Sequence, residues 1–420
     1  MKASDDRQIE PMDPAAGQPA ATRFEKARSI CLGLLILGGV GVLLGWPMNP
    51  NQFYFCYLTS WAFCWTTLMG VLFFVMLHHV VDAGWSTVVR RPAEQMLAAM
   101  PWLLVLAIPI LIGMFTGHLH EWLRGDPHLE GFKGVFLSVP FLIGRLAIYA
   151  AAFLWLSFVL RRNSLRQDAD GAAHWSISSR RWASGGMVIY ALTMTFCAID
   201  LMMALNDHWF STIFSVYVWS GAVVAGLCAI TLLTIPLMRG PLRNRIGSDQ
   251  IYTLGALIFA FSVFWAYIAF SQYFLIWYSN IPEETIYFLR RWTGLENEPA
   301  GTWWILSILM PIGRFVLPFL ILMSALTKRN PKILGIMCVI LLFSHWLDQY
   351  WMVQPAHSEQ NPPIAWLWMD LSCLMLIVGI CGMAVIRALR GAALFPLKDP
   401  RLVEALSAEP VDHLAGADVE

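Results

Sequence analysis

Residues 54–79 read YFCYLTSWAFCWTTLMGVLFFVMLHH, a run of 26 residues that contains no aspartate, glutamate, lysine or arginine. A helix needs about 20 predominantly apolar residues to cross the hydrocarbon core of a bilayer, so this run is long enough to span a membrane. Similar runs recur at roughly 29–46, 93–116, 136–160, 182–205, 212–238, 251–278, 302–326, 332–353 and 364–388. The sequence therefore predicts an all-α integral membrane protein with about ten transmembrane helices.

The composition agrees with this class. Hydrophobic residues make up 58% of the 420 residues, and charged residues make up only 13%. A soluble globular protein has about 45–50% apolar and about 25% charged residues. Basic and acidic residues balance at 28 each, so the net charge is zero and indicates no nucleic-acid partner.

Basic residues alternate between the predicted connections. If the N-terminus lies inside, the inside segments hold 22 lysines and arginines and the outside connections hold four. Cytoplasmic segments of membrane proteins carry such an excess. We therefore expect residues 1–28 and 391–420 to be cytoplasmic tails of a membrane domain at 29–390. The first tail lacks the apolar centre of a signal peptide, so we expect the first span to remain uncleaved.

The eight cysteines all lie in apolar runs, and none forms a C-x-x-C pattern. Iron–sulfur clusters, structural zinc and covalently attached haem therefore have no recognisable ligand set in this chain. His78 and His79 are adjacent and would point about 100° apart on a helix, so paired axial ligands for a b-type haem are not expected either. We expect no metal and no directly bound cofactor.

One outside connection, at 279–301, is predicted to contain a helix of its own. It begins Asn280-Ile281-Pro282-Glu283, which resembles a capping box with proline in the first turn. Acidic residues follow in the first turn and basic residues in the last, as the helix dipole favours. We expect a short helix on the outer membrane surface.

Two predicted spans share a short motif, which indicates an internal repeat. Ile143-Gly144-Arg145 in the fourth span matches Ile312-Gly313-Arg314 in the eighth. Because the offset of four spans is even, both copies have the same orientation in the membrane. We expect two parallel-repeat four-helix bundles, at about 54–205 and 212–353, with the first and last spans as flanking helices. The span after each motif carries one acid and is followed by a histidine: Asp200 with His208, and Asp348 with His357.

Ionisable side chains inside the spans are the clearest functional signal, because a charge at membrane depth is costly unless it is paired or hydrated. In each bundle, the arginine of the motif and the acid of the next span are predicted to approach each other. His345 shares a helix face with Asp348. We interpret the outer group as a proton relay or a quinol head-group site, or alternatively as two structural Arg–Asp ties. It consists of Arg145, Asp200, His208, Arg314, His345, Asp348 and Asp370.

A second polar group lies near the inner ends of the second and third spans. It consists of His78, His79, Asp82 and Glu94. Histidines titrate near neutral pH, so this group predicts an inner proton entrance. The alternative interpretation is that these side chains anchor the helix ends at the membrane interface.

Three runs resemble a known family: DLMMALNDHWFSTIF at 200–214, SQYFLIWYSNIPEET at 271–285 and SHWLD at 344–348. They are similar to the F-type membrane subunit of bacterial alternative complex III, a quinol:cytochrome c oxidoreductase. That subunit belongs to the polysulfide-reductase membrane-anchor superfamily, whose members consist of two four-helix bundles with flanking helices. The resemblance covers nearly all of residues 29–390.

This resemblance implies a place in the bacterial inner membrane. It implies partner subunits that hold haem c and iron–sulfur clusters, and a homologous membrane subunit. The expected role is to form proton-conducting polar half-channels and a scaffold, with no redox centre in this chain. Alternatives are a quinol-binding subunit of the same complex, a secondary transporter and a purely structural scaffold.

Overall fold

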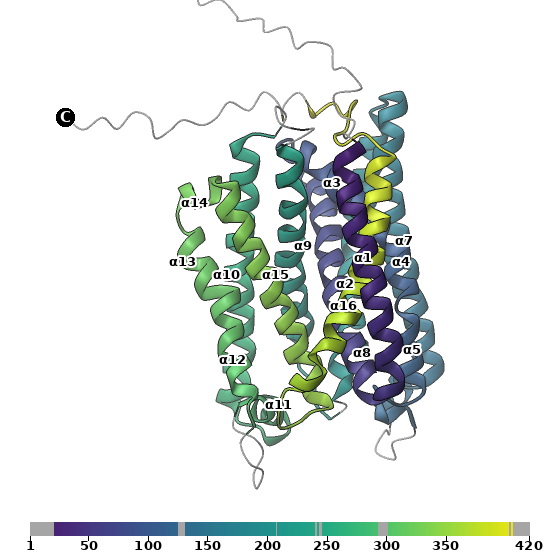
Figure 1. Ribbon diagram of the computed structural model, residues 1–420, viewed down its shortest axis with the longest axis vertical. Helices are drawn as coiled ribbons and strands as arrows, with labels where there is room; N and C mark the ends of the chain where they lie inside the picture. Colours follow the sequence, from purple (N-terminus) through teal and green to yellow (C-terminus); the bar gives the residue numbers. More distant parts are fainter. Residues whose placement is uncertain are drawn as a thin grey trace, which may run out of the picture.

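The computed structural model describes residues 21–124, 131–206, 208–239, 242, 246–292, 301–402 and 405. Most of both predicted tails lies outside these residues, as do Arg243 and Arg245 of one predicted inside connection. Ten segments of the described chain are long and apolar enough to cross a membrane, which confirms the predicted fold class (Figure 1). Eight are built on one long helix each: α1 (Ala21–Met48), α2 (Pro50–Val80), α7 (Val139–Asp170), α8 (His174–Leu201), α9 (Phe214–Met238), α10 (Ser248–Ser279), α15 (Pro331–Val353) and α16 (Leu367–Arg390).

The third and eighth spans are divided into shorter helices at prolines. The third consists of α3 (Thr87–Met96), η2 (Leu97–Ala99), α4 (Met100–Val105) and α5 (Ile108–Phe115). The eighth consists of α12 (Trp303–Pro311), the π-helical turn η5 (Ile312–Val316) and α13 (Leu317–Leu322). Proline has no N–H to donate and its ring clashes with the preceding turn. Pro101 and Pro109 therefore begin new helices, and Pro311 and Pro318 flank the π turn.

Short helices complete the connections. They are η3 (Glu121–Arg124), α6 (Gly131–Phe136), η4 (Met203–Leu205), α11 (Pro282–Trp292), α14 (Ala325–Arg329), η6 (Gln354–Ala356) and η7 (Ile364–Trp366). Helix α11 confirms the short helix predicted in the connection at 279–301, including its acidic first turn and basic last turn. Arg291 of that last turn is buried, however, and its Nε and Nη2 donate to the carbonyls of Trp351 and Met352, each at 3.1 Å.

The contacts between spans agree with two four-helix bundles. In the first, α2 packs against α3 and α8, and α7 packs against α8; in the second, α9 packs against α10 and α15, and α12 packs against α15. Helices α2 and α9 join the bundles. They approach closely because both contact sites are glycines: a Cβ on Gly70 would lie 1.9 Å from the carbonyl oxygen of Ala222, and a Cβ on Gly226 would lie 2.4 Å from the carbonyl carbon of Gly70. The flanking helices α1 and α16 pack against each other, and α16 packs on α2 (Figure 1).

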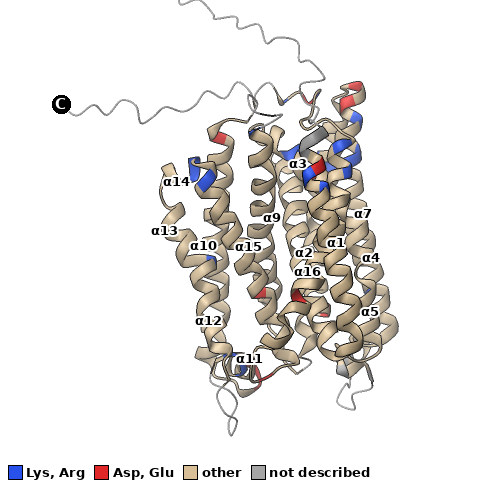
Figure 2. Ribbon diagram, viewed as in Figure 1, with Lys and Arg blue, Asp and Glu red and all other residues tan. Residues whose placement is uncertain are grey.

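Charged residues gather at the ends of the helices. Figure 2 shows lysine and arginine around α3, α7 and α14, at the end where α1 begins and α16 ends. We call this the basic end, and the end that holds α11 the outer end. The middle of the bundle carries few charges in this view, so those that lie inside the spans can be treated one by one.

The predicted C-terminal tail does not begin at residue 391. Leu394, Phe395 and Leu402 are each at most 2% exposed, and Leu397 donates its backbone N–H to Asp168 of α7 at 3.0 Å. The sequence prediction missed this packing because three apolar residues spread over nine positions give no helical or strand period. Residues 391–402, which we call the C-terminal strap, cover the basic end of the first bundle.

Candidate functional site

One buried polar group surrounds Arg314 and contacts both bundles. The π turn of the eighth span presents this side chain between α15 and α9. Its Nη1 lies 3.0 Å from Oδ2 of Asp348 and 2.7 Å from Nδ1 of His345. The Tyr217 hydroxyl donates to the other oxygen of Asp348, and Nε2 of His345 lies 2.8 Å from the hydroxyl of Thr66 on α2. We call these five residues the Arg314 cluster, and they link both bundles.

The geometry determines the protonation of His345. A guanidinium group donates hydrogen bonds and has no acceptor. Because Nη1 of Arg314 faces Nδ1 of His345, Nδ1 must accept, and the ring must be neutral with its proton on Nε2. That proton is donated to the Thr66 hydroxyl, which itself donates to the carbonyl of Ala62 at 2.7 Å. The cluster therefore forms a directed chain of hydrogen bonds from Arg314 to α2.

Close packing holds Arg314 in place. Its guanidinium carbon lies 4.5 Å above the ring centre of Trp265, a favourable position for a cation. A Cβ on Gly221 of α9 would come within 2.3 Å of Nη2 of Arg314. Among the described residues, the Nε and Nη2 atoms of Arg314 have no hydrogen-bond partner. Buried donors without a partner are costly.

The second predicted pair, Arg145 and Asp200, forms a more complete tie. Nε and Nη2 of Arg145 contact the two carboxylate oxygens of Asp200 at 3.0 and 2.8 Å. The Tyr149 hydroxyl donates to the same carboxylate at 2.8 Å, and Nη1 of Arg145 donates to the Phe136 carbonyl at 2.6 Å. This bidentate geometry is strong and specific, and it is typical of a structural tie.

Nearby, His120 donates from Nε2 to the backbone carbonyl of Asp200 at 3.1 Å. The side chain is fully buried in the connection after α5. Burial lowers the pKa of His120 to about 4, and the hydrogen bond to the carbonyl only partly opposes this effect. His120 is therefore neutral at neutral pH.

Asp370 forms a third, separate group. Its Oδ1 accepts from the Gln354 amide at 3.1 Å, and Gln354 accepts from Gln52 at 2.9 Å. Its Oδ2 has no hydrogen-bond partner among the described residues. Within the described chain, no hydrogen bond or ion pair joins Asp200, Asp348 and Asp370 to one another. The outer group predicted from the sequence is therefore divided into three separate groups in the structure.

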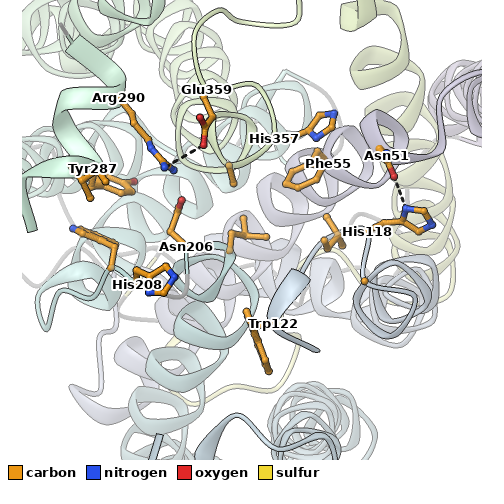
Figure 3. A pocket seen from close by; sticks show the side chains of 16 residues that line it. Asn51, Phe55, His118, Trp122, Asn206, His208, Tyr287, Arg290, His357 and Glu359 are labelled. Carbon is orange, nitrogen blue, oxygen red and sulfur yellow. Dashed lines mark hydrogen bonds and ion pairs between the residues drawn. The ribbon is translucent and has the colours of Figure 1, made fainter. Parts of the chain in front are cut away.

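His208 lies away from the buried interior. It is exposed at the outer end and lines a pocket of about 860 Å³ together with Asn206 and Tyr287 (Figure 3). In this pocket Arg290 contacts Glu359 at 3.2 Å, and His118 contacts Asn51 at 2.5 Å (Figure 3). The prediction placed His208 in the relay because it follows Asp200 in sequence, but the turn after η4 carries it to the surface.

At the basic end, the predicted inner group is only partly assembled. Nε2 of His79 lies 3.5 Å from Glu94. His78 instead contacts the Phe74 carbonyl through Nδ1 at 2.7 Å. Asp82 lies half-exposed at the surface, where it pairs with Arg401 and, at 3.7 Å, with Arg180. Of the four residues predicted to form one entrance, His79 and Glu94 are in direct contact, and Asp82 is linked to Glu94 only indirectly, through Arg401, Asp399 and Arg90. Among the described residues, no hydrogen bond or ion pair joins His78 to the other three.

That pair belongs to a larger buried cluster that the sequence prediction missed. Glu94 also contacts Arg90 at 3.1 Å and Arg91 at 3.5 Å, and it accepts from the Ser164 hydroxyl. Each arginine also forms an ion pair with a second acid. Arg90 contacts Asp399 of the C-terminal strap at 2.5 Å, and Arg91 contacts Asp168 at 2.6 Å. We call His79, Arg90, Arg91, Glu94, Ser164, Asp168 and Asp399 the inner cluster.

The missed residues left partial signals in the sequence. Arg90 and Arg91 precede Glu94 by four and three residues, which is the spacing of helix neighbours. Tyr149 likewise follows Arg145 by four residues. Tyr217 and Asp399 come from distant segments, and no local pattern could place them.

An aromatic pocket of about 690 Å³ adjoins the Arg314 cluster. Its lining includes Tyr217, Tyr267, Phe270, Tyr273, Arg291 and Phe315. Tyr267 and Phe270 of α10 are 64% and 63% exposed on the lipid-facing side of this span. The pocket therefore has exposed aromatic residues of α10 and the buried Tyr217 in one lining.

In the part of the chain that the structure describes, no group of three or more histidine, cysteine, aspartate or glutamate residues is arranged to hold a metal ion. Comparisons with protein-family models and with curated proteins found no match for the chain.

Proposed function

We propose that this protein is a membrane subunit of a quinol-oxidising respiratory complex of the alternative complex III type in a bacterial inner membrane. Its termini would lie in the cytoplasm, so the basic end would face the cytoplasm. Its partners would be a homologous membrane subunit and further subunits that hold haem c and iron–sulfur clusters. In this proposal the chain itself carries protons through two polar half-channels.

The observation that supports this proposal most strongly is the Arg314 cluster. It contains three titratable side chains and one arginine in direct hydrogen-bond contact, all of them buried. A purely structural tie needs only the arginine and Asp348. The neutral His345 adds a group that can accept a proton. If the Arg314 guanidinium moved away from His345 to bind Asp348 alone, Nδ1 of His345 would lose its donor and could accept a proton.

We propose two half-channels rather than one continuous path because of helix α2, which contributes a residue to each cluster. Thr66 reaches the Arg314 cluster and His79 reaches the inner cluster. His79 follows Thr66 by 13 residues, which corresponds to about 20 Å of helix. The buried α2 residues in this interval are almost all apolar, from Leu68 to Met76. Protons entering from either side would therefore meet an apolar layer, which favours two half-channels over one continuous path.

A single substitution tests the relay without removing the hydrogen bonds. In His345→Gln, the amide oxygen can accept from Arg314 and the amide nitrogen can donate to Thr66, but the side chain cannot be protonated near neutral pH. We expect the complex to assemble and to oxidise quinol, but with fewer protons translocated per quinol in proteoliposomes. His120→Gln is the matched control, because it replaces a buried histidine outside the cluster. Unchanged proton translocation in His345→Gln would refute the relay.

The aromatic pocket favours a second candidate function, quinol binding by this chain. A quinol has an apolar tail and a polar ring that must release protons on oxidation. The pocket combines an apolar, lipid-facing wall with the Tyr217 hydroxyl, which contacts Asp348. In this second proposal the quinol site lies in the second bundle, beside the Arg314 cluster.

Photo-labelling distinguishes the two candidates. An azido-quinone bound in the aromatic pocket would label peptides from 263–273 and 287–315 of this chain. Tyr217→Phe should then weaken quinol oxidation, since it removes the hydroxyl and keeps the ring. Labelling confined to partner subunits would contradict quinol binding here and leave the proton-conducting role as the proposal.

A further inference from the structure

A groove of about 1010 Å³ opens at the basic end between α1, α4, α7 and α16. Helix α16 forms its floor, because it packs against both α1 and α4. The apolar wall includes Leu35, Trp102, Val105, Ile380 and Met383. Trp102 and Val105 are more than half exposed, at 53% and 56%, so part of this wall faces the bilayer.

Four arginines surround the groove: Arg28, Arg161, Arg387 and Arg390. Arg28 precedes the wall residue Leu35 by seven residues on α1, and Arg387 follows Ile380 by seven on α16. Seven residues of helix correspond to about 10 Å. The arginines therefore form a rim at the basic end, and the apolar wall lies about 10 Å deeper in the membrane.

The rim is short of negative charge. Glu25 contacts Arg390 at 3.0 Å and Arg28 at 3.6 Å, so one carboxylate serves two arginines. The Nε of Arg161 donates to the neutral amide of Gln95 at 3.0 Å. In the described chain, neither Arg161 nor Arg387 has an ion-pair partner. Among the residues that the structure describes, one carboxylate, that of Glu25, therefore forms the ion pairs of this four-arginine rim.

We propose that this groove binds an anionic phospholipid, with its phosphate among the four arginines and its acyl chains along the apolar wall. Basic pockets between transmembrane helices on the cytoplasmic side recognise lipids in this way. A soluble anion would use the rim but not the wall. The positive-inside rule explains arginines at this end, but it does not require four of them around one groove.

The test uses the delipidated, full-length protein, titrated with phosphatidylglycerol or with zwitterionic phosphatidylethanolamine and followed by native mass spectrometry. The variant Arg387→Gln/Arg390→Gln removes two rim charges. Its control, Arg162→Gln/Arg166→Gln, removes two arginines of α7 that do not line the groove; they contact Phe158 and Trp175 instead. We expect phosphatidylglycerol to bind about 25-fold more weakly to the rim variant and within about threefold of wild type to the control.

Three outcomes would overturn the proposal. They are unchanged phosphatidylglycerol binding in the rim variant, equal weakening in the control, and phosphatidylethanolamine binding as tight as that of phosphatidylglycerol. If the rim variant does not fold, Ala384→Phe provides a second test, because it fills the groove and keeps all four arginines. That variant should also lose phosphatidylglycerol binding, and retained binding would contradict the proposed site. None of these results depends on proton or quinol chemistry.

Discussion

Removing the charge of Asp200 should destabilise the protein strongly. The carboxylate is 1% exposed and accepts two hydrogen bonds from Arg145 and one from Tyr149. In Asp200→Asn, the arginine stays buried and loses its counter-charge. Breaking a buried ion pair by removing one partner costs about 3–5 kcal/mol. We expect a loss of this size in the free energy of unfolding.

The assay is unfolding in mixed micelles of a mild detergent and sodium dodecyl sulfate, followed by tryptophan fluorescence. Asp249→Asn is the matched control, because Asp249 is 30% exposed and lies 3.5 Å from Arg329. An exposed pair of this kind contributes about 0–1 kcal/mol. The double variant Arg145→Met/Asp200→Leu should recover most of the loss, since it removes both charges together. The reasoning is refuted if Asp200→Asn costs no more than Asp249→Asn.

Three further predictions follow from single contacts. Gly221→Ala should displace Arg314, because the added Cβ would lie 2.3 Å from its Nη2; we expect reduced proton translocation, and wild-type translocation would contradict this packing. His120 has a pKa lowered to about 4 by burial, so its contribution to stability should be complete above pH ~6.5 and lost as the pH falls toward ~4; unfolding of His120→Gln should show a weaker pH dependence in that window, and an unchanged dependence would contradict the assignment. Burial alone would raise the pKa of Asp399, but Arg90 and Arg401 outweigh it and hold the pKa at about 2, so Asp399→Asn should release the C-terminal strap; faster proteolysis within 391–402 would support this, and unchanged proteolysis would contradict it.

Much of the fold could be predicted because membrane insertion imposes a simple requirement on sequence. Each span needs a long apolar run, and the run at 54–79 becomes α2 with an extension of a few residues at its start. Interruptions were harder to predict, since a proline in a membrane helix is sometimes tolerated. The π turn at Ile312–Val316, which positions Arg314, gave no signal beyond its flanking prolines.

The candidate site could be predicted only in part. Repetition of the Ile-Gly-Arg motif located both Arg–Asp pairs, and the i−3 spacing placed His345 beside Asp348 on one helix face. The sequence alone could not show that Arg145 forms a bidentate pair with its aspartate, whereas Arg314 keeps two donor atoms without a described partner. The surroundings of Arg314 also depend on Tyr217 and Thr66, which come from other helices. The sequence also could not show that Asp370 lies apart.

The central claim, membership of a quinol-oxidising respiratory complex, is tested most directly by mild-detergent purification through a tag at the C-terminus. The purified sample would be examined by visible absorbance and by mass spectrometry of its subunits. The proposal predicts a haem c spectrum and several co-purifying proteins, including a homologous membrane subunit. A colourless preparation that contains only this chain would contradict it, and would favour a secondary transporter.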